Sequence, residues 1–281
     1  MQTDCHHIHM PLKTMGPKGA WLVAELHARS RTVFTHDDVE VITGLRLKSA
    51  RNLVARLVDH GIATRLKPGL FVLVPFEMGH EREYMGNPYV VARELTGGGD
   101  YYISHASAME LHGMVTQPQL VVFTSTPRFI RSQVLLGVEF RFVRCKPQGL
   151  FGIEEHWVDK TQKVRISDPE RTIIDGLKQP EHCGGVSEVA KGMWMLRNKM
   201  NPERLVDYAL RLDVGAVIRR LGFLIESCGI NAPEQIERLR KRLSDGYQLL
   251  DPMLETEGKY LARWRLQLNV EPDELEAARS T

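Results

Sequence analysis

Apolar residues recur at helical spacing in three separate stretches of the first 60 positions. The stretch 17–29 is the first of these and predicts a helix with one apolar face. The stretch 35–44 is the second: Thr35 is a suitable N-cap, acids occupy the first turn, and Gly44 can end the helix. The third stretch, 47–60, completes a set of three predicted helices.

The third predicted helix has two contrasting faces. One face is apolar at the i, i+3, i+4, i+7 and i+8 positions of a buried stripe, namely Ala50, Leu53, Val54, Leu57 and Val58. The other face is polar, and between Arg46 and Arg56 the chain has four cations and no acid. A helix face that meets only solvent usually mixes both signs. The one-sided charge therefore favours contact with a polyanion.

Two β-prone runs follow the basic helix, at 62–66 and 70–74, and Lys67-Pro68-Gly69 forms the turn between them. A short helix, a turn, a basic helix and a hairpin are typical of a winged helix-turn-helix domain, whose second helix enters the DNA major groove. The predicted DNA contacts are the polar residues of the basic helix and hairpin: Arg46, Lys48, Ser49, Arg51, Asn52, Arg56, Arg65 and Lys67.

Side-chain chemistry divides these predicted contacts into two kinds. Arg51 and Asn52 are the candidate base readers, because arginine pairs with guanine edges and asparagine with adenine edges. Most of the other cations are expected to hold phosphates, which sets the register on the duplex without reading its sequence. These phosphate contacts are Lys48, Arg56, Arg65 and Lys67.

The remaining three quarters of the chain changes pattern from strands to helices. Strand patterns occupy 119–127 and two predicted hairpins, 131–145 and 154–167. Helical patterns occupy 87–95, 101–114, 168–178, 184–200, 202–212, 214–227 and 232–244, and strands return at 248–254 and 260–270. The predicted fold class is α+β: a winged helix-turn-helix domain over 1–75 with a flexible start at 1–15, a linker at 76–89, and a larger mixed α+β domain over 90–281.

Composition narrows the class of protein without identifying a function. With 43% hydrophobic and 26% charged residues, the 281-residue chain has the balance of a soluble globular protein. It contains no apolar run of the ~18 residues that a membrane span needs, and its start lacks the apolar centre of a secretory signal. The four cysteines are far apart and form no CxxC pair, so we expect a cytoplasmic protein without a disulfide framework.

The net charge of +2 is unevenly distributed along the chain. Residues 1–75 carry +4 and the remainder carries −2, so the expected polyanionic partner belongs to the first quarter. The histidine-rich stretch at 5–9 is too short to close a tetrahedral metal site alone, and no second cluster follows it. No metal or cofactor is expected.

Candidate catalytic residues in the larger domain are few and scattered. His105, His112 and His156 lie next to apolar positions and are expected to be structural, and no GxSxG, Walker or HExxH motif is present. Asp251 with Glu257 and Lys259 resembles the metal site of many nucleases, in which carboxylates hold the cation. The short spacing makes this a weak signal, so the domain is expected not to be an enzyme.

The most distinctive stretches are YYISHASAMELHGM at 101–114 and ISDPERTIIDGLKQPEHCGGVSEVAKGM at 166–193, with RRLGFLIES and LDPML nearer the end. In these stretches, and over nearly its whole length, the chain resembles the AbiEi antitoxins, the transcriptional-regulator half of the AbiE abortive-infection toxin–antitoxin systems. The motif residues in the larger domain are Ser104, His105, His112, Asp168, Glu170, Thr172 and Asp175.

The resemblance implies a bacterial phage-defence protein that represses its own operon by binding promoter inverted repeats, with two protomers per operator. It also implies that the larger domain neutralises a nucleotidyltransferase-like toxin encoded beside it, whether or not the two proteins touch. One alternative is a stand-alone DNA-binding regulator with a ligand-sensing domain. A third hypothesis is a DNA-targeted metal-dependent nuclease that uses Asp251, Glu257 and Lys259.

Overall fold

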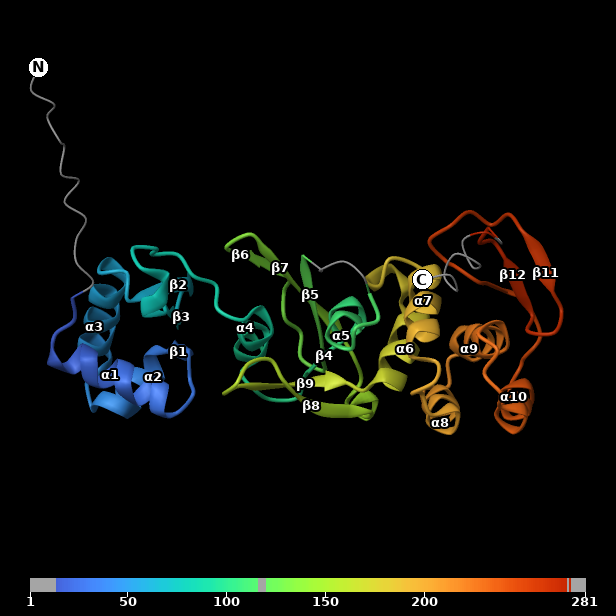
Figure 1. Cartoon of the computed structure of the whole chain (residues 1–281), viewed down its shortest axis with the longest axis horizontal. Coiled ribbons are helices and arrows are strands. Elements are labelled where there is room, and N and C mark those ends of the chain that lie inside the picture. The colour runs from blue at the N-terminus through green and yellow to red at the C-terminus, as the bar shows by residue number, and fades with distance from the viewer. Residues whose placement is uncertain (1–13, 116–119, 272, 274–281) are drawn as a thin grey trace, which may run out of the picture. The chain divides into compact units, whose positions relative to one another are not determined.

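The fold is mixed α+β in a computed structural model that describes residues 14–115, 120–271 and 273. The histidine-rich stretch at 5–9 and most of the extension predicted at 1–15 lie outside these residues. The chain divides into two units. The first contains the chain up to Leu95 with Val134–Val138 and Trp157–Lys163, and the second contains the rest. Each unit is described by itself below (Figure 1).

Three helices of the first unit lie where the apolar pattern predicts them: α1 (Pro17–Ala28), α2 (His36–Thr43) and α3 (Leu47–Asp59). The Thr35 side chain accepts a hydrogen bond from the Asp38 backbone, and the Asp38 carboxylate accepts one from the Thr35 backbone, at 2.7 Å. This capping box satisfies two donors that a helix start leaves free. Gly44 ends α2 in the left-handed region at φ 69°, as predicted.

A small antiparallel sheet follows, built from β1 (Val33–Thr35), β2 (Ala63–Lys67) and β3 (Leu70–Leu73) in the order β1-β3-β2. The β2–β3 hairpin agrees with the sequence pattern, whereas β1 was not predicted because three residues give too short a pattern. The apolar faces of α1, α2, α3 and the hairpin close one core, which includes Leu22, Leu26, Phe34, Val39, Leu53, Leu57 and Phe71.

The predicted linker, 76–89, belongs to the first unit together with helix α4 (Pro88–Leu95). A single turn of 3-10 helix, η1 (Phe76–Met78), begins it. Thr64 of β2 donates a hydrogen bond to the carbonyl of Arg82 and accepts one from the Tyr84 backbone, at 2.8 and 3.0 Å. These bonds hold the segment along the hairpin.

A six-stranded sheet, most of which belongs to the second unit, has the order β6-β7-β5-β4-β9-β8. Its strands are β4 (Tyr102–Ile103), β5 (Val121–Thr126), β6 (Gln133–Leu135), β7 (Val138–Arg144), β8 (Ile153–Trp157) and β9 (Lys163–Ser167). Strand β4 pairs antiparallel with β5 and parallel with β9. Helix α5 (His105–Leu111) follows β4 directly and packs on β5. A 3-10 turn, η2 (Pro147–Gly149), lies between β7 and β8.

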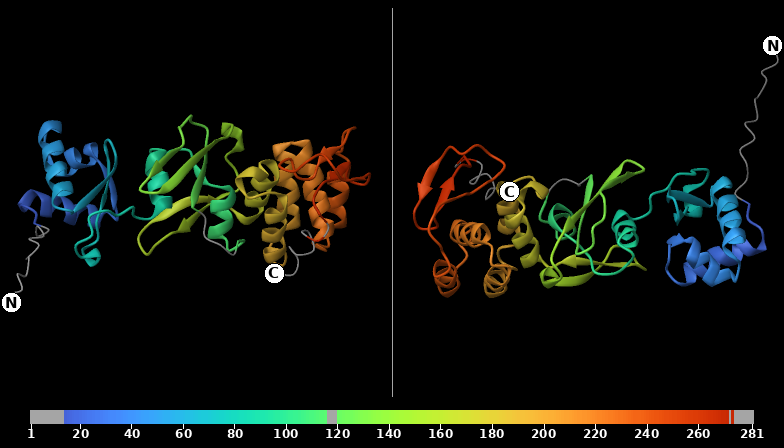
Figure 2. Two further views of the ribbon diagram at one scale, coloured as in Figure 1. Left: turned by 90° about the horizontal axis from the view of Figure 1, so that it is seen from above. Right: turned by 180° about the vertical axis from the view of Figure 1, so that it is seen from behind.

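Helices form the rest of the second unit: α6 (Pro169–Lys178), α7 (Val186–Leu196), α8 (Pro202–Leu212), α9 (Gly215–Ser227) and α10 (Pro233–Arg240), with the 3-10 turn η3 (Pro180–His182) after α6. Helix α6 is central, since α5, α7, α8 and α9 all contact it (Figure 2). A small sheet of β10 (Gln248–Leu249), β12 (Leu266–Leu268) and β11 (Lys259–Leu261) covers α9 through the buried Trp264.

Two details of the second unit depend on close packing. Gly222 on α9 is required by Trp264, because a Cβ at Gly222 would lie 2.1 Å from the indole ring. The strands predicted at 248–254 and 260–270 are shorter in the structure, since Asp251 leaves the sheet and a turn with Arg265 at φ 49° divides the second run. Within the described residues, no helix combines the length and the apolar character that crossing a membrane would need.

Candidate functional site

Helix α3 exposes the side chains for which the sequence predicts DNA contacts. Its apolar residues Ala50, Leu53, Val54 and Leu57 are buried, as predicted. The predicted contacts on the opposite side are all exposed: Arg46, Lys48, Ser49, Arg51, Asn52 and Arg56. The amphipathic pattern therefore fixes which face of α3 points to solvent.

The hairpin adds two further cations beside α3. Arg65 is exposed, and Lys67 is partly buried next to the turn at Gly69, which adopts φ 83°. A bulge between Arg65 and Lys67 shifts the β2–β3 register at this point. Burial lowers the pKa of Lys67, because low-dielectric surroundings favour the uncharged amine.

The cations of α3 and the hairpin share one electrostatic property. Within the described residues, none of their side chains forms an ion pair or a hydrogen bond; they are Arg46, Lys48, Arg51, Arg56, Arg65 and Lys67. By contrast, Arg31 of the same unit lies 2.8 Å from Asp38 and 3.5 Å from Glu94. Among the described residues, therefore, no acid of the first unit pairs with these cations.

Two grooves run along the exposed side of α3, and each is lined by some of the predicted contacts. The hairpin-side groove has a volume of about 620 Å³ and lies between α3 and the β2–β3 hairpin; its lining includes His36, Arg51, Val54, Asp59, Arg65 and Phe71. The α1-side groove has a volume of about 700 Å³ and is lined by residues that include Lys18, Leu45, Ser49, Asn52 and Arg56. The two candidate base readers, Arg51 and Asn52, thus line different grooves.

His36 and Lys18 were not among the predicted contacts, although both lie in these grooves. The ring of His36 packs edge-on against Phe71 with 5.0 Å between centroids, and its Nδ1 atom is buried without a partner among the described residues. Burial lowers the pKa of His36, and the positive charges of Arg51 and Arg65 lower it further, whereas Asp37 and Glu40 oppose them. Nothing local in the sequence marks His36, because its neighbours come from α3 and the hairpin.

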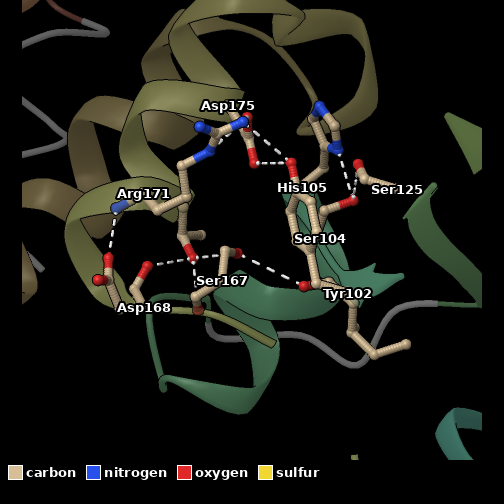
Figure 3. A network of polar contacts seen from close by, with 10 residues as sticks. Tyr102, Ser104, His105, Ser125, Ser167, Asp168, Arg171 and Asp175 are labelled. Atoms are coloured by element: carbon tan, nitrogen blue, oxygen red, sulfur yellow. Dashed lines mark hydrogen bonds and ion pairs between the residues drawn. The ribbon is translucent and has the colours of Figure 1, made fainter. Parts of the chain in front are cut away.

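The motif residues of the second unit form a different kind of site, a buried polar network between the sheet and α6 (Figure 3). The Arg171 guanidinium pairs with Asp175 at 2.9 Å and donates to the Tyr102 hydroxyl at 3.0 Å. The Tyr102 hydroxyl in turn donates to Asp175 at 3.0 Å. Burial, which favours the neutral form of Arg171, is outweighed by Asp175 and Tyr102, so the pKa of Arg171 is raised.

The start of α6 is held by its own side chains and by a side chain of α8. Asp168 accepts the Arg171 backbone N–H at 2.7 Å, so it is the N-cap, and it also accepts the Tyr208 hydroxyl at 2.8 Å. Burial and Asp168 raise the pKa of Tyr208 to about 12. Glu170 accepts the Asn201 backbone N–H at 2.7 Å and thereby ties α6 to the start of α8.

The remaining motif residues lie at the two ends of α5 and on α6, and they bond to each other or to residues of β5 and β9. Ser104 precedes α5, but its hydroxyl makes no cap bond there: it accepts a hydrogen bond from Ser125 at 2.8 Å and shares one with His105 Nδ1 at 2.9 Å. His112 Nε2 donates to the Ser167 carbonyl at 2.6 Å. Thr172 shares a hydrogen bond with the Ser167 hydroxyl at 2.7 Å.

His105 combines burial with an unusual backbone. It is 1% exposed, adopts φ 53° between β4 and α5, and has its Nε2 atom buried without a partner among the described residues. Burial lowers its pKa to about 4, so the imidazole is neutral at physiological pH. The ring lies 5.1 Å from that of His182, which lines a cavity of about 440 Å³ with Phe123, Glu181, Cys183, Glu188 and Lys191.

The nuclease-like triplet is not assembled as a metal site. Asp251 is buried and accepts the backbone N–H groups of Val186 and Met253 at 2.6 and 2.9 Å, so its carboxylate holds the start of α7. Glu257 and Lys259 are exposed. No cluster of three or more histidine, cysteine, aspartate or glutamate side chains suited to a metal ion occurs among the residues that the structure describes.

Comparison with known proteins supplies a fold and no function. No protein-family model matches the chain, and no curated protein matches it. Among solved structures, the crystal structure of the RV2827C protein from Mycobacterium tuberculosis is similar, with a TM-score of 0.67. The match covers 95% of this chain and 96% of that chain at 15% identity. At this identity the likeness shows a shared fold alone.

Proposed function

We propose that this protein is a DNA-binding antitoxin of the AbiEi type. Its first unit contains a winged helix-turn-helix domain at 1–75 that binds inverted repeats in its own promoter, with two protomers on each operator. The domain at 90–281 neutralises a nucleotidyltransferase-like toxin by surface recognition and without catalysis of its own. The protein works in the cytoplasm.

One observation carries the proposal: six cations on α3 and the hairpin have no acidic partner within the described part of the chain. Exposed ion pairs contribute little to stability, so unpaired surface cations are not needed for folding. Duplex DNA offers a dense row of phosphates, and each contact with a cation releases counterions. An α-helix that presents such cations beside a hairpin matches the geometry of major-groove recognition.

The motif residues support the second half of the proposal in a different way. They are held by internal hydrogen bonds, and six of the seven are buried; they are Ser104, His105, Asp168, Glu170, Thr172 and Asp175. Polar side chains that are buried and hydrogen-bonded inside a domain stabilise it and are not accessible to a substrate. The activity of this domain is therefore assigned to its surface.

DNA binding is tested by fluorescence anisotropy on a duplex from the region upstream of the gene, with a shuffled duplex for comparison. Binding should weaken steeply as salt rises from roughly 50 to 200 mM. Replacing both Lys48 and Arg56 by Ala should weaken binding to both duplexes and flatten the salt dependence, by about one unit of slope for each phosphate that the variant no longer binds. Lys199→Ala is the matched control, because Lys199 is an exposed lysine of the second unit.

Equal affinity of the wild type and the double variant, or binding that ignores salt, would contradict the DNA-binding half of the proposal. The antitoxin half is tested by co-expression with the nucleotidyltransferase-like protein encoded by the adjacent gene. The Lys48→Ala/Arg56→Ala variant should lose promoter binding yet still rescue growth. If the wild type fails to rescue growth, the antitoxin half of the proposal is contradicted.

A stand-alone regulator whose second unit senses a small ligand is the second candidate function. The cavity of about 440 Å³ beside His182 is the observation that favours it. In that case the wild type would bind its promoter but would not rescue growth. The co-expression experiment therefore separates the two candidates.

A further inference from the structure

Helix α3 lies between two grooves, so its exposed residues face two different surfaces. Neighbouring residues on an α-helix point about 100° apart, which places Arg51 in the hairpin-side groove and Asn52 in the α1-side groove. Asn52 shares its groove with Ser49, Arg56 and Lys18. The two residues that the sequence nominates as base readers therefore face different grooves.

Three nitrogen-bearing side chains from three elements meet in the hairpin-side groove. Arg51 comes from α3, Arg65 from β2 and His36 from the first turn of α2. Arg65 lies opposite Phe71 in the hairpin register, and the Phe71 ring contacts the ring of His36. This places Arg65 and His36 on the same side of the hairpin.

Acids lie near the hairpin-side groove, but among the described residues none of them pairs with its arginines. Arg51 and Arg65 form no ion pair or hydrogen bond with any described residue. Asp59, which also lines the groove, is eight residues from Arg51 and so lies about 12 Å further along the helix axis. On α2, Asp37 and Glu40 favour the charged form of His36, while both arginines oppose it.

The surroundings suit a phosphate better than a base edge. Val54, Val58 and Phe71 also line the groove and offer an anion no donors, so Arg51, Arg65 and His36 supply the side-chain donors there. Two arginines that approach from separate elements can each offer paired N–H donors to phosphate oxygens. A bound phosphate would also relieve the repulsion between these arginines and a protonated His36.

We propose that the hairpin-side groove binds one backbone phosphate of the DNA duplex through Arg51, Arg65 and protonated His36, so that Arg51 sets position and does not read sequence. This assignment rests on the proposed DNA-binding function. It makes binding proton-linked, because burial and both arginines lower the pKa of His36 in the free protein, whereas a bound phosphate favours the protonated imidazole. Affinity should therefore increase as pH falls.

The test measures anisotropy on the promoter and shuffled duplexes between about pH 8 and pH 6, where an imidazole near a phosphate titrates. Wild-type affinity should increase toward pH 6, and the increase should be lost in His36→Gln and in His36→Asn. Arg51→Ala should weaken both duplexes by the same factor and lower the salt slope by about one. Asn52→Ala is the matched control, since it should weaken the promoter duplex alone.

Two outcomes would overturn the assignment alone, and a third would contradict DNA binding itself. An Arg51→Ala effect confined to the promoter duplex means that Arg51 reads a base, which overturns the assignment. A pH dependence that survives both His36 substitutions overturns it as well, while leaving DNA binding intact. Wild-type protein that shows no salt-sensitive binding to either duplex contradicts the proposed function itself, and this assignment with it.

Discussion

The arginines of α3 and the β2–β3 hairpin have surroundings opposite to those of three arginines in the second unit. In the first unit, Arg51, Arg56 and Arg65 are exposed and have no partner among the described residues. In the second unit, the side chains of Arg171, Arg219 and Arg220 are buried and bonded: Arg171 to Asp175, and the other two to backbone carbonyls of distant elements. Arg220, for example, donates to the Leu177 carbonyl at 2.7 Å.

The contrast shows how a charged residue can be assigned a role. A buried guanidinium is costly unless its donors are satisfied, so the partners of Arg171 explain why it is retained. An exposed cation without partners has no such structural explanation, which leaves it available to a partner outside the chain. The comparison leads to three predictions about stability, ordered from the largest expected effect to the smallest.

Removing Arg171 should have the largest effect. Arg171→Ala leaves Asp175 and the Tyr102 hydroxyl buried beside an empty space, and breaking a buried pair in this way typically costs about 3–5 kcal/mol. Urea unfolding followed by circular dichroism measures this loss. The double variant Arg171→Met/Asp175→Asn should recover part of it, because no unpaired charge then remains. A loss below about 1 kcal/mol for Arg171→Ala would show that the pair is not structural.

His105 should make stability depend on pH. The pKa of His105 is about 4 in the folded state, below its ordinary value of 6.5, so the unfolded chain binds the proton first as pH falls. The stabilisation that comes from keeping His105 unprotonated is complete above about pH 6.5 and is lost progressively toward about pH 4. The free energy of unfolding should fall by roughly 2 kcal/mol between pH 7 and pH 5.

The control for this second prediction is His105→Asn. Asparagine has no titrating group in this range and tolerates the positive φ of position 105. Free energies of unfolding at pH 7 and pH 5 should differ less in this variant than in the wild type, by roughly the same 2 kcal/mol. An identical pH dependence in both proteins would mean that His105 does not carry it.

The cations of the first unit should contribute least to stability. Lys48→Ala and Arg56→Ala remove exposed side chains that have no partner in the described chain, and should change the free energy of unfolding by at most about 0.5 kcal/mol. The same urea experiment measures this change beside Arg171→Ala. If Lys48→Ala or Arg56→Ala destabilised the protein as much as Arg171→Ala, the exposed cations of the first unit would be as structural as the buried arginines of the second.

Local patterns predicted much of the fold in both units. The apolar stripe of α3, the cap at Thr35 and the end of α2 at Gly44 agree with the structure, because each depends on residues within one or two helical turns. Asp168 caps α6 in a similarly local way, through the backbone N–H of Arg171 three residues further on. The two-residue strand β4 was not separated from the helix that follows it, since so short a strand has no pattern of its own.

What the sequence determined by itself is the placement of helices and hairpins, the buried and exposed faces of α3, and the concentration of positive charge in the first quarter. The tertiary structure alone decided the partners. Tyr102 meets Asp175 across 73 residues, and Arg51 separates from Asn52 because α3 lies between two grooves. Periodicity and capping act within a few residues, whereas the surroundings of a side chain are set by elements that are distant along the chain.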